Sequence, residues 1–111
     1  MAKFETELTG RSFDEWIERF ENEIINGSVS ASLEDKSDFR SPDGKSRVSV
    51  RVFERYSMAG GNRLSLNLTM FQDETGTIRL SAISSGGSNA LFFKINTWGE
   101  EAFLDRLKEL I

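Results

Sequence analysis

Residues 64–83 read LSLNLTMFQDETGTIRLSAI, and this stretch decides the fold class. On both sides of Asp73-Glu74-Thr75-Gly76, apolar and polar residues alternate with the period of two that is typical of a β-strand with one buried face. The connection between the two predicted strands is long enough for an antiparallel hairpin, but it is too short for a parallel crossover. The stretch therefore predicts an antiparallel sheet.

The same alternation continues outward in both directions. Val48, Val50 and Val52 alternate with arginine and serine after the turn signal at 41–44, and a shorter run precedes that turn. A further run follows Gly86-Gly87, and another opens the chain. The expected strands are centred on residues 4–8, 28–33, 47–52, 64–71, 78–83 and 91–95.

Two helices are expected around these strands. Ser12 and Glu15 have the spacing of a capping box, in which each side chain bonds the other residue's backbone N–H. Apolar residues then recur every three or four positions up to Ile24, and Gly27 is expected to end the helix in the left-handed conformation. A second capping box at 97–100 begins a C-terminal helix with Leu107 and Leu110 on its apolar stripe.

These elements predict one α+β domain over residues 1–111. Two amphipathic helices need an apolar surface to cover, and one face of the sheet provides it. We therefore expect a two-layer sandwich in which two helices lie on one face of an antiparallel sheet of about five to six strands. The expected order of elements is β-α-β-β-β-β-β-α.

Composition limits the chemistry of this chain of 111 residues. It has a net charge of -4, no cysteine and no histidine, so disulfides, thiolate metal sites and the commonest acid–base group are excluded. No catalytic motif, metal site or cofactor is predicted, and we expect a protein that is not an enzyme. The N-terminus has no apolar leader segment and no segment is long enough to span a membrane, which predicts a cytoplasmic protein without membrane contact.

One face of the sheet is expected to point away from the helices. Residues 1–35 hold three basic and nine acidic side chains, whereas residues 36–94 hold nine basic and five acidic ones. This distribution predicts an acidic helical layer over a basic sheet. The residues expected on the outward face are Ser28, Ser30, Ser32, Arg47, Ser49, Arg51, Phe53, Arg55, Arg63, Ser65, Asn67, Thr69, Phe71, Arg79, Ser81 and Ile83.

Three interpretations of this outward face remain open. It is a solvated sheet surface, or an association surface for a homodimer or another protein, or a single-stranded nucleic-acid surface. The last is disfavoured because the chain is acidic and lacks the aromatic motifs of RNA-binding sheets. The candidate binding residues of the face are Arg47, Arg51, Phe53, Arg55, Phe71 and Arg79.

Other site-like features have simpler structural explanations. Glu54 shares the parity of Val52 and is expected to point inward, where burial would raise its pKa, although an exit to solvent at the strand end also explains it. Residues 84–89 resemble an anion-binding loop but lack the lysine of a P-loop, so a hairpin connection is expected. Asp35, Asp38 and Asp43 miss the spacing of a calcium loop, and no metal site is predicted.

The segment FFKINTWGEE at 92–101, followed by Phe103-Leu104, resembles the C-terminal end of a small uncharacterised domain family of Gram-positive bacteria. That resemblance covers nearly the whole chain and implies no activity and no functional residues. The order of elements is also similar to helix-grip domains, which hold apolar ligands between a sheet and the last helix. This similarity implies an alternative site for a small ligand at Phe93, Trp98, Phe103 and Glu54.

The hypothesis from sequence is therefore a small cytosolic, non-enzymatic domain that binds a protein or itself through the arginine- and phenylalanine-bearing sheet face. A small apolar-ligand pocket under the C-terminal helix is the alternative.

Overall fold

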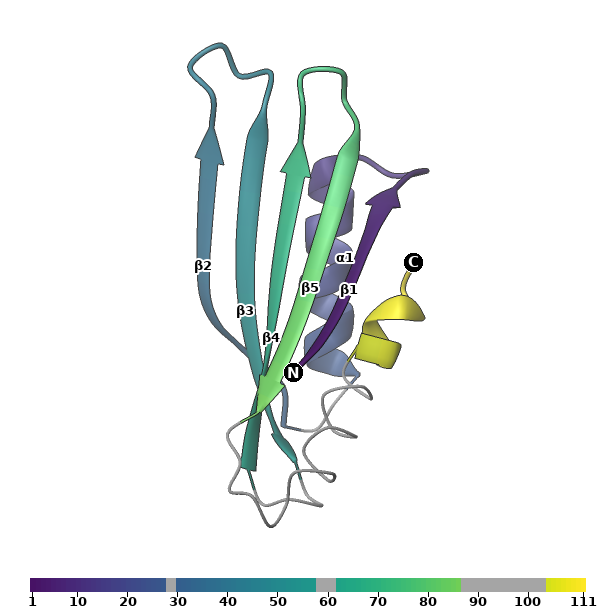
Figure 1. Ribbon diagram of the computed structural model, residues 1–111, viewed down its shortest axis with the longest axis vertical. Coiled ribbons are helices and arrows are strands. Elements are labelled where there is room, and N and C mark those ends of the chain that lie inside the picture. Colours follow the sequence, from purple (N-terminus) through teal and green to yellow (C-terminus); the bar gives the residue numbers. More distant parts are fainter. Residues whose placement is uncertain (28–29, 58–61, 87–103) are drawn as a thin grey trace.

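The computed structural model describes residues 1–27, 30–57, 62–86 and 104–111. Five strands form one antiparallel sheet in the order β1-β5-β4-β3-β2 (Figure 1), which confirms the antiparallel sheet that was predicted. The expected strand at 91–95 and the second capping box at 97–100 lie outside the described residues. The elements are β1 (Ala2–Leu8), α1 (Phe13–Asn26), β2 (Ser32–Arg40), β3 (Arg47–Ser57), β4 (Asn62–Gln72), β5 (Ile78–Gly86) and a helical segment at 104–108.

Helix α1 begins with the predicted capping box. The backbone N–H of Glu15 donates to the Ser12 hydroxyl over 3.2 Å, and the N–H of Ser12 donates to the Glu15 carboxylate over 3.2 Å. The side chains of Asp14 and Glu15 place negative charge at the positive end of the helix dipole. The capping box therefore sets the start of α1 as the sequence predicted.

The end of α1 differs from the prediction. Gly27 has φ -80°, so the expected left-handed conformation is wrong. A Cβ at this position would instead clash with Nε of Arg106, whose guanidinium packs against the end of the helix. Arg106 also lies 3.5 Å from the carbonyl oxygen of Glu23. Glycine leaves room at this position for the Arg106 guanidinium, which would have to move if a side chain were introduced.

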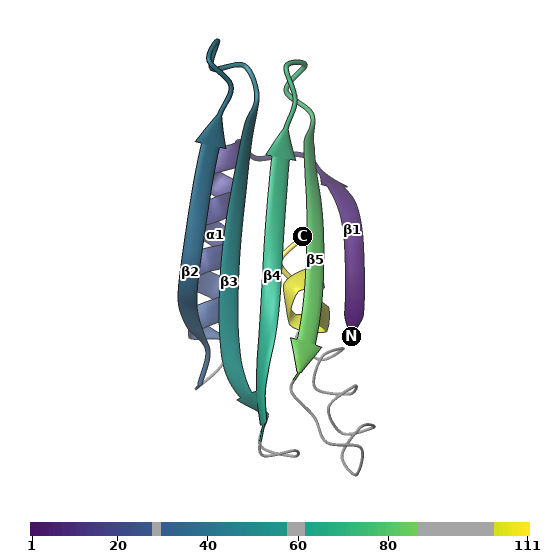
Figure 2. The ribbon, with the colours of Figure 1, turned by 60° about the vertical axis from the view of Figure 1, so that its left-hand side comes forward.

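Helix α1 and the helical segment at 104–108 lie on the same side of the sheet, as Figure 2 shows. The apolar stripe of α1 is buried, and the rings of Trp16 and Phe20 stack with centroids 5.6 Å apart. Nε of Arg19 donates to the carbonyl oxygen of Leu110 over 2.9 Å, which ties the C-terminal residues to α1. The buried core consists of Leu8, Phe13, Trp16, Phe20, Ile24, Phe53, Leu64, Leu66, Leu68, Met70, Ile78, Leu80, Ala82, Leu104, Leu107 and Leu110.

The predicted hairpin turns are confirmed at 41–44 and 73–76. The N–H of Gly44 donates to the carbonyl of Ser41 over 2.9 Å, and that of Gly76 donates to the carbonyl of Asp73 over 3.0 Å. Both glycines have positive φ, 73° and 90°, a conformation that side chains disfavour. These turns fix the registers of β2–β3 and β4–β5.

Strand β2 lies further along the chain than expected. The alternation at 28–33 predicted a strand there, whereas β2 spans Ser32–Arg40 and contains a register shift between Leu33 and Asp35. Nearly all of β2 is exposed because it forms one edge of the sheet. A polar segment can form an edge strand because neither of its faces needs to be fully buried, and its charges discourage pairing with another chain.

The face assignment of β3 is the main correction to the sequence-based prediction. Register pairs Arg51 with Leu68 and Phe53 with Leu66, so these four side chains share the face that α1 covers. In the last pair of this hairpin, Ser57 of β3 lies opposite Asn62 of β4, with four residues between them in the sequence. Because this number is even, odd-numbered residues of β3 pair with even-numbered residues of β4. The valines of β3 therefore face away from the helix, and the expectation that its arginines do so is wrong.

Candidate interaction surface

A polar cluster lies beneath α1, where Arg51 is only 6% exposed. Its Nε lies 2.6 Å from the Glu21 carboxylate on α1, and its Nη1 lies 3.1 Å from the Asp38 carboxylate on β2. Nη1 also donates to the carbonyl of Val50 over 2.9 Å. A buried charge needs such partners, and here the guanidinium of Arg51 on β3 joins α1 to the edge strand β2.

The same contacts shift two pKa values. Burial disfavours the charged form of Arg51, but its hydrogen bonds to Glu21 and Asp38 outweigh burial and raise its pKa. The pKa of Asp38 is lowered, first by the hydrogen bond that it accepts from the Ser49 hydroxyl and then by Arg51. Both shifts favour the ionised forms of Arg51 and Asp38 at neutral pH, so the ion pair between β3 and β2 stays charged.

Arg47, Phe53 and Arg55 also lie on the covered face. The Arg47 guanidinium lies 4.1 Å from the centroid of the Phe13 ring and 3.0 Å from the Asp14 carboxylate. Phe53 is fully buried in the core. Arg55 is half-buried, and burial lowers its pKa. Their placement on the outward face was therefore wrong.

The charge separation seen in the sequence has a different meaning in the structure. The acidic residues Asp14 and Glu21 of α1 pair with Arg47 and Arg51 of β3 across the helix–sheet interface. The basic character of β3 is thus largely neutralised inside the fold. The predicted basic outer surface does not form at this strand.

The face of the sheet that points away from α1, hereafter the open face, is arranged in rows. Residues paired across neighbouring strands point to the same side, so each row crosses the whole sheet. We name three rows by their member on β4. The Phe71 row is Phe39, Val48, Phe71, Arg79 and Glu7; the Thr69 row is Ser37, Val50, Thr69, Ser81 and Glu5; the Asn67 row is Asp35, Val52, Asn67, Ile83 and Lys3.

Apolar side chains gather on the open face and form what we call the apolar patch. Phe39 is 66% exposed, Phe71 is 44% exposed and Ile83 is 36% exposed. The valines between them are half-buried. Phe39, the valines and Phe71 adjoin one another, whereas Asn67 separates Ile83 from Val52. A group of exposed apolar residues of this kind marks an interaction surface more often than singly scattered ones do. The apolar patch consists of Phe39, Val48, Val50, Val52, Phe71 and Ile83.

Charged side chains of the three rows lie mostly on the outer strands. Lys3, Glu5 and Glu7 belong to β1 and Asp35 belongs to β2, so they flank the centre of the open face. Nζ of Lys3 lies 2.6 Å from the carboxylate of Glu5. Arg79 on β5 is the charged residue of the three rows that lies beside the central strand. A mostly uncharged centre with a charged rim resembles the anatomy of protein–protein interfaces.

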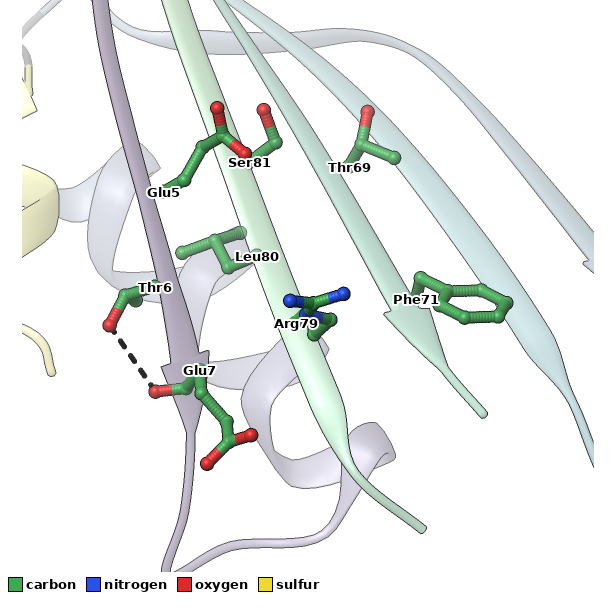
Figure 3. Close-up of a pocket in the computed structure, with 8 residues that line it drawn as sticks. All are labelled: Glu5, Thr6, Glu7, Thr69, Phe71, Arg79, Leu80 and Ser81. Carbon is green, nitrogen blue, oxygen red and sulfur yellow. Dashed lines mark hydrogen bonds between the residues drawn. The ribbon is translucent and has the colours of Figure 1, made fainter. Parts of the chain in front are cut away.

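Arg79 lies within a hollow of about 440 Å³ on the open face, over β1, β5 and β4 (Figure 3). Its guanidinium extends toward Phe71, while the hydroxyls of Thr69 and Ser81 line the other end. Glu5 and Glu7 form the side of the hollow along β1. The hollow is shallow and has charges of both signs, which suits a side chain of a docked protein better than a small anion.

Glu54 does not point inward as its parity suggested, and its position agrees with the simpler explanation of an exit to solvent. It pairs with Ser65 on the open face, and its carboxylate lies 2.9 Å from Nη1 of Arg63. This removes Glu54 from the alternative pocket under the C-terminal helix. The other residues of that pocket, Phe93, Trp98 and Phe103, lie outside the described residues, so a ligand at that place stays a prediction.

The structure therefore brings together only part of the predicted site. Phe71 and Arg79 lie on the open face as expected, together with Arg63, Ser65, Asn67, Thr69, Ser81 and Ile83. Sequence reasoning missed Phe39 and the three valines of β3. Phe39 lay in a segment interpreted as a loop, and the valines had been assigned to the core. The even spacing across the β3–β4 connection was the signal that could have revealed them.

The site and the fold define a small α+β protein with an antiparallel sheet that has one covered face and one open face. The chain belongs to the family of unknown function DUF6054, whose model matches residues 1–111. This confirms the resemblance to an uncharacterised family. Comparison with curated proteins gives no match, and comparison with solved structures gives none either. Within the described ranges, no helix is long and apolar enough to cross a membrane.

Proposed function

We propose that this protein acts without catalysis, by self-association in which two copies bury the open faces of their sheets against each other. The observation that carries the proposal is the apolar patch, which no helix or strand of the described residues covers. Two antiparallel sheets commonly pack face to face, with side chains of their inner faces interdigitating. The open face then becomes the centre of an interface.

The size of the open face supports a second copy as the occupant. Five strands at a spacing of about 4.8 Å, with lengths near 30 Å, give a footprint of roughly 700 Å². A standard stable interface buries about 800 Å² on each partner. A sheet of the same dimensions therefore matches the area that a stable dimer needs.

The charges of the open face also support a second copy. Its three rows contain the basic residues Lys3 and Arg79 and the acidic residues Glu5, Glu7 and Asp35, which nearly balance. The acidic residues of α1 lie on the other side of the sheet. Two copies of a chain with net charge -4 can thus meet through this face without strong repulsion.

Sequence features support the remaining parts of the proposal. The lack of histidine and cysteine supports a non-catalytic role because most acid–base and nucleophilic sites use one of them. The resemblance of residues 92–104 supports an origin in a Gram-positive bacterium, and the proposal includes a cytoplasmic location. The two helical segments on one side of the sheet support a two-layer sandwich for the whole domain.

Sedimentation equilibrium over a wide concentration range tests the proposal. We expect the wild-type chain to form a dimer reversibly, and we expect Phe71→Lys to raise the dissociation constant at least tenfold because it buries an unpaired charge at the interface centre. Ile83→Lys provides a second, independent variant on the same face. Circular dichroism checks that both variants fold.

Ile111→Lys is the matched control, because Ile111 is 46% exposed, like Phe71, but lies in the C-terminal segment. It should leave the dimer unchanged. A wild-type chain that stays monomeric at every concentration would overturn the proposal. Equal weakening by Phe71→Lys and Ile111→Lys would also overturn it, as would a stable complex with a different protein that excludes the second copy.

A further inference from the structure

The arrangement of residues on the open face indicates how two copies would pack. This inference rests on the proposed self-association. β4 is the central strand, with β5 and β3 beside it and β1 and β2 at the edges. A symmetric face-to-face dimer has its two-fold axis between the sheets, and this axis runs either along the strands or across them. The two choices bring different residues together.

An axis across the strands, centred on the Thr69 row, would place each strand over the same strand of the second copy. Glu5 would then face Glu5 of the second copy, and Phe39 would face Asp35. Glu7 would face Lys3 favourably, but the two Glu5 carboxylates would meet as like charges, which is unfavourable. The contact between the two Glu5 residues opposes this arrangement.

An axis along β4 places each row over the same row of the second copy. It also brings the strands on one side of β4 over the strands on the other side. β2 then covers β1, and β3 covers β5. Lys3 faces Asp35 in the Asn67 row, so opposite charges meet at the rim, and Val52 faces Ile83 beside them. In the Phe71 row, Phe39 faces the β1 side at Glu7, and Val48 faces Arg79. The central strands contact each other through the Phe71 side chains.

The same axis brings a protruding side chain on β2 over a hollow at β1 and β5. Phe39 is the most exposed aromatic ring of the open face, at 66%, and it lies on β2 in the Phe71 row. The hollow lies at the same row on the opposite side, over β1 and β5, with Phe71 and Arg79 in its wall (Figure 3). A ring that enters this hollow gains aromatic contact with Phe71 and stacks on the Arg79 guanidinium.

We propose that the dimer has its two-fold axis along β4, so that Phe39 of each copy occupies the hollow beside Arg79 of the other. Packed sheets cross at about 30°, which shifts an edge strand by roughly 5 Å along its length. This shift is smaller than the spacing of about 6.8 Å between rows. Phe39 therefore stays within reach of the hollow, which extends over two rows.

Cross-linking of introduced cysteines tests this arrangement, and the chain has no cysteine of its own to interfere. Facing sheets lie about 10 Å apart, too far for a disulfide, so a short bis-maleimide is the suitable reagent. Ser37→Cys and Glu5→Cys are exposed positions of the Thr69 row on the two edge strands. With the axis along β4, Ser37 of one copy faces Glu5 of the other, whereas the two Ser37 positions are roughly 20 Å apart laterally.

We expect a covalent dimer when the two variants are refolded together and little or none when either is treated alone. Asn22→Cys, on the exposed side of α1, is the control and should not cross-link. A covalent dimer from Ser37→Cys alone would overturn the axis along β4, although the self-association itself would stand. If sedimentation shows no dimer, the proposed function fails and this arrangement fails with it.

Discussion

β3 and β4 are neighbouring strands with the same alternation of residues, yet they use it in opposite ways. β4 turns Leu64, Leu66 and Leu68 toward the helices and its polar residues outward. β3 turns Arg51 and Phe53 toward α1 and its valines outward. The difference teaches that hydrophobic alternation shows that a strand has two unlike faces, whereas pairing with its neighbour decides which of them is covered.

The covered arginines are tolerated because α1 and β2 present carboxylates to them. Glu21 and Asp38 bracket Arg51, and Asp14 reaches Arg47. The exposed valines are tolerated because β-branched residues suit a strand even where it is half-exposed. The price is a patch of apolar surface, which the proposed dimer would bury.

The largest effect should come from Phe53→Ala, which empties a fully buried position of β3. We expect unfolding to become easier by about 4 kcal/mol, as for other buried phenylalanines. Phe71→Ala is the matched control on the open face and should cost less than about 1 kcal/mol in the monomer. Urea unfolding at low protein concentration measures both. Similar losses for the two variants would contradict the assignment of faces on β3.

Arg51→Met should have the next largest effect, because it leaves Glu21 and Asp38 without their cation. We expect a loss of about 2 kcal/mol, less than for a fully buried pair since both carboxylates are partly exposed. Arg79→Met on the open face should change the free energy of unfolding by less than about 0.5 kcal/mol. A small effect at Arg51 and a large one at Arg79 would mean that the two faces have been exchanged.

Asp38→Asn tests the covered face of β3 through the pH dependence of the free energy of unfolding. Folding lowers the pKa of Asp38, so the unfolded chain takes up a proton more readily than the folded one as the pH falls. The stabilisation by Asp38 is present above its unfolded pKa and is lost as the pH falls through its folded pKa. We expect the variant to cost about 0.5 kcal/mol at neutral pH.

Thermal unfolding at several pH values measures this contribution. The difference between wild type and Asp38→Asn should disappear in strong acid, where the wild-type carboxyl is also neutral. Asp35→Asn, on the open side of the same edge strand, is the control, and a pH-dependent loss as large for it as for Asp38→Asn would contradict the role of Arg51.

The smallest effect should come from Val50→Thr, which keeps the branched shape on the open face. We expect the monomer to lose less than about 0.5 kcal/mol. Leu68→Thr, on the covered face, should cost more than about 2 kcal/mol because it leaves a cavity and buries a hydroxyl. Denaturant unfolding of the monomer compares the two variants. A cost for Val50→Thr near that for Leu68→Thr would place the valines in the core.

The sequence predicted the antiparallel sheet, the capped helix α1, both hairpin turns, and the faces of β4 and β5. These features depend on local signals such as the Ser12–Glu15 spacing, the glycines of the turns and the leucine alternation. It did not predict the faces of β3, because three valines are a stronger local signal for burial than an arginine. The compensating charges on Glu21 and Asp38 are distant along the chain and become neighbours only when the strands pair.

Residues of the candidate site were predicted correctly only where the face indicated by local alternation is the same as the face set by strand pairing. Phe71 and Arg79 were placed correctly, whereas Phe39 was hidden in a polar segment that forms an edge strand. Gly27 shows the same limit at the end of α1. A glycine after a helix favours a left-handed cap, but here it leaves room for Arg106, which is 79 positions further along the chain.

Thiol labelling of two adjacent positions on β3 tests the central claim most directly. In a chain without cysteine, Ser49→Cys and Val50→Cys each introduce one thiol, and Ser49 is only 1% exposed on the covered face. At concentrations low enough to keep the protein monomeric, we predict that the thiol at position 50 reacts rapidly with a maleimide. The thiol at position 49 should react only after unfolding. Rapid labelling at 49 with protection at 50 would contradict the account.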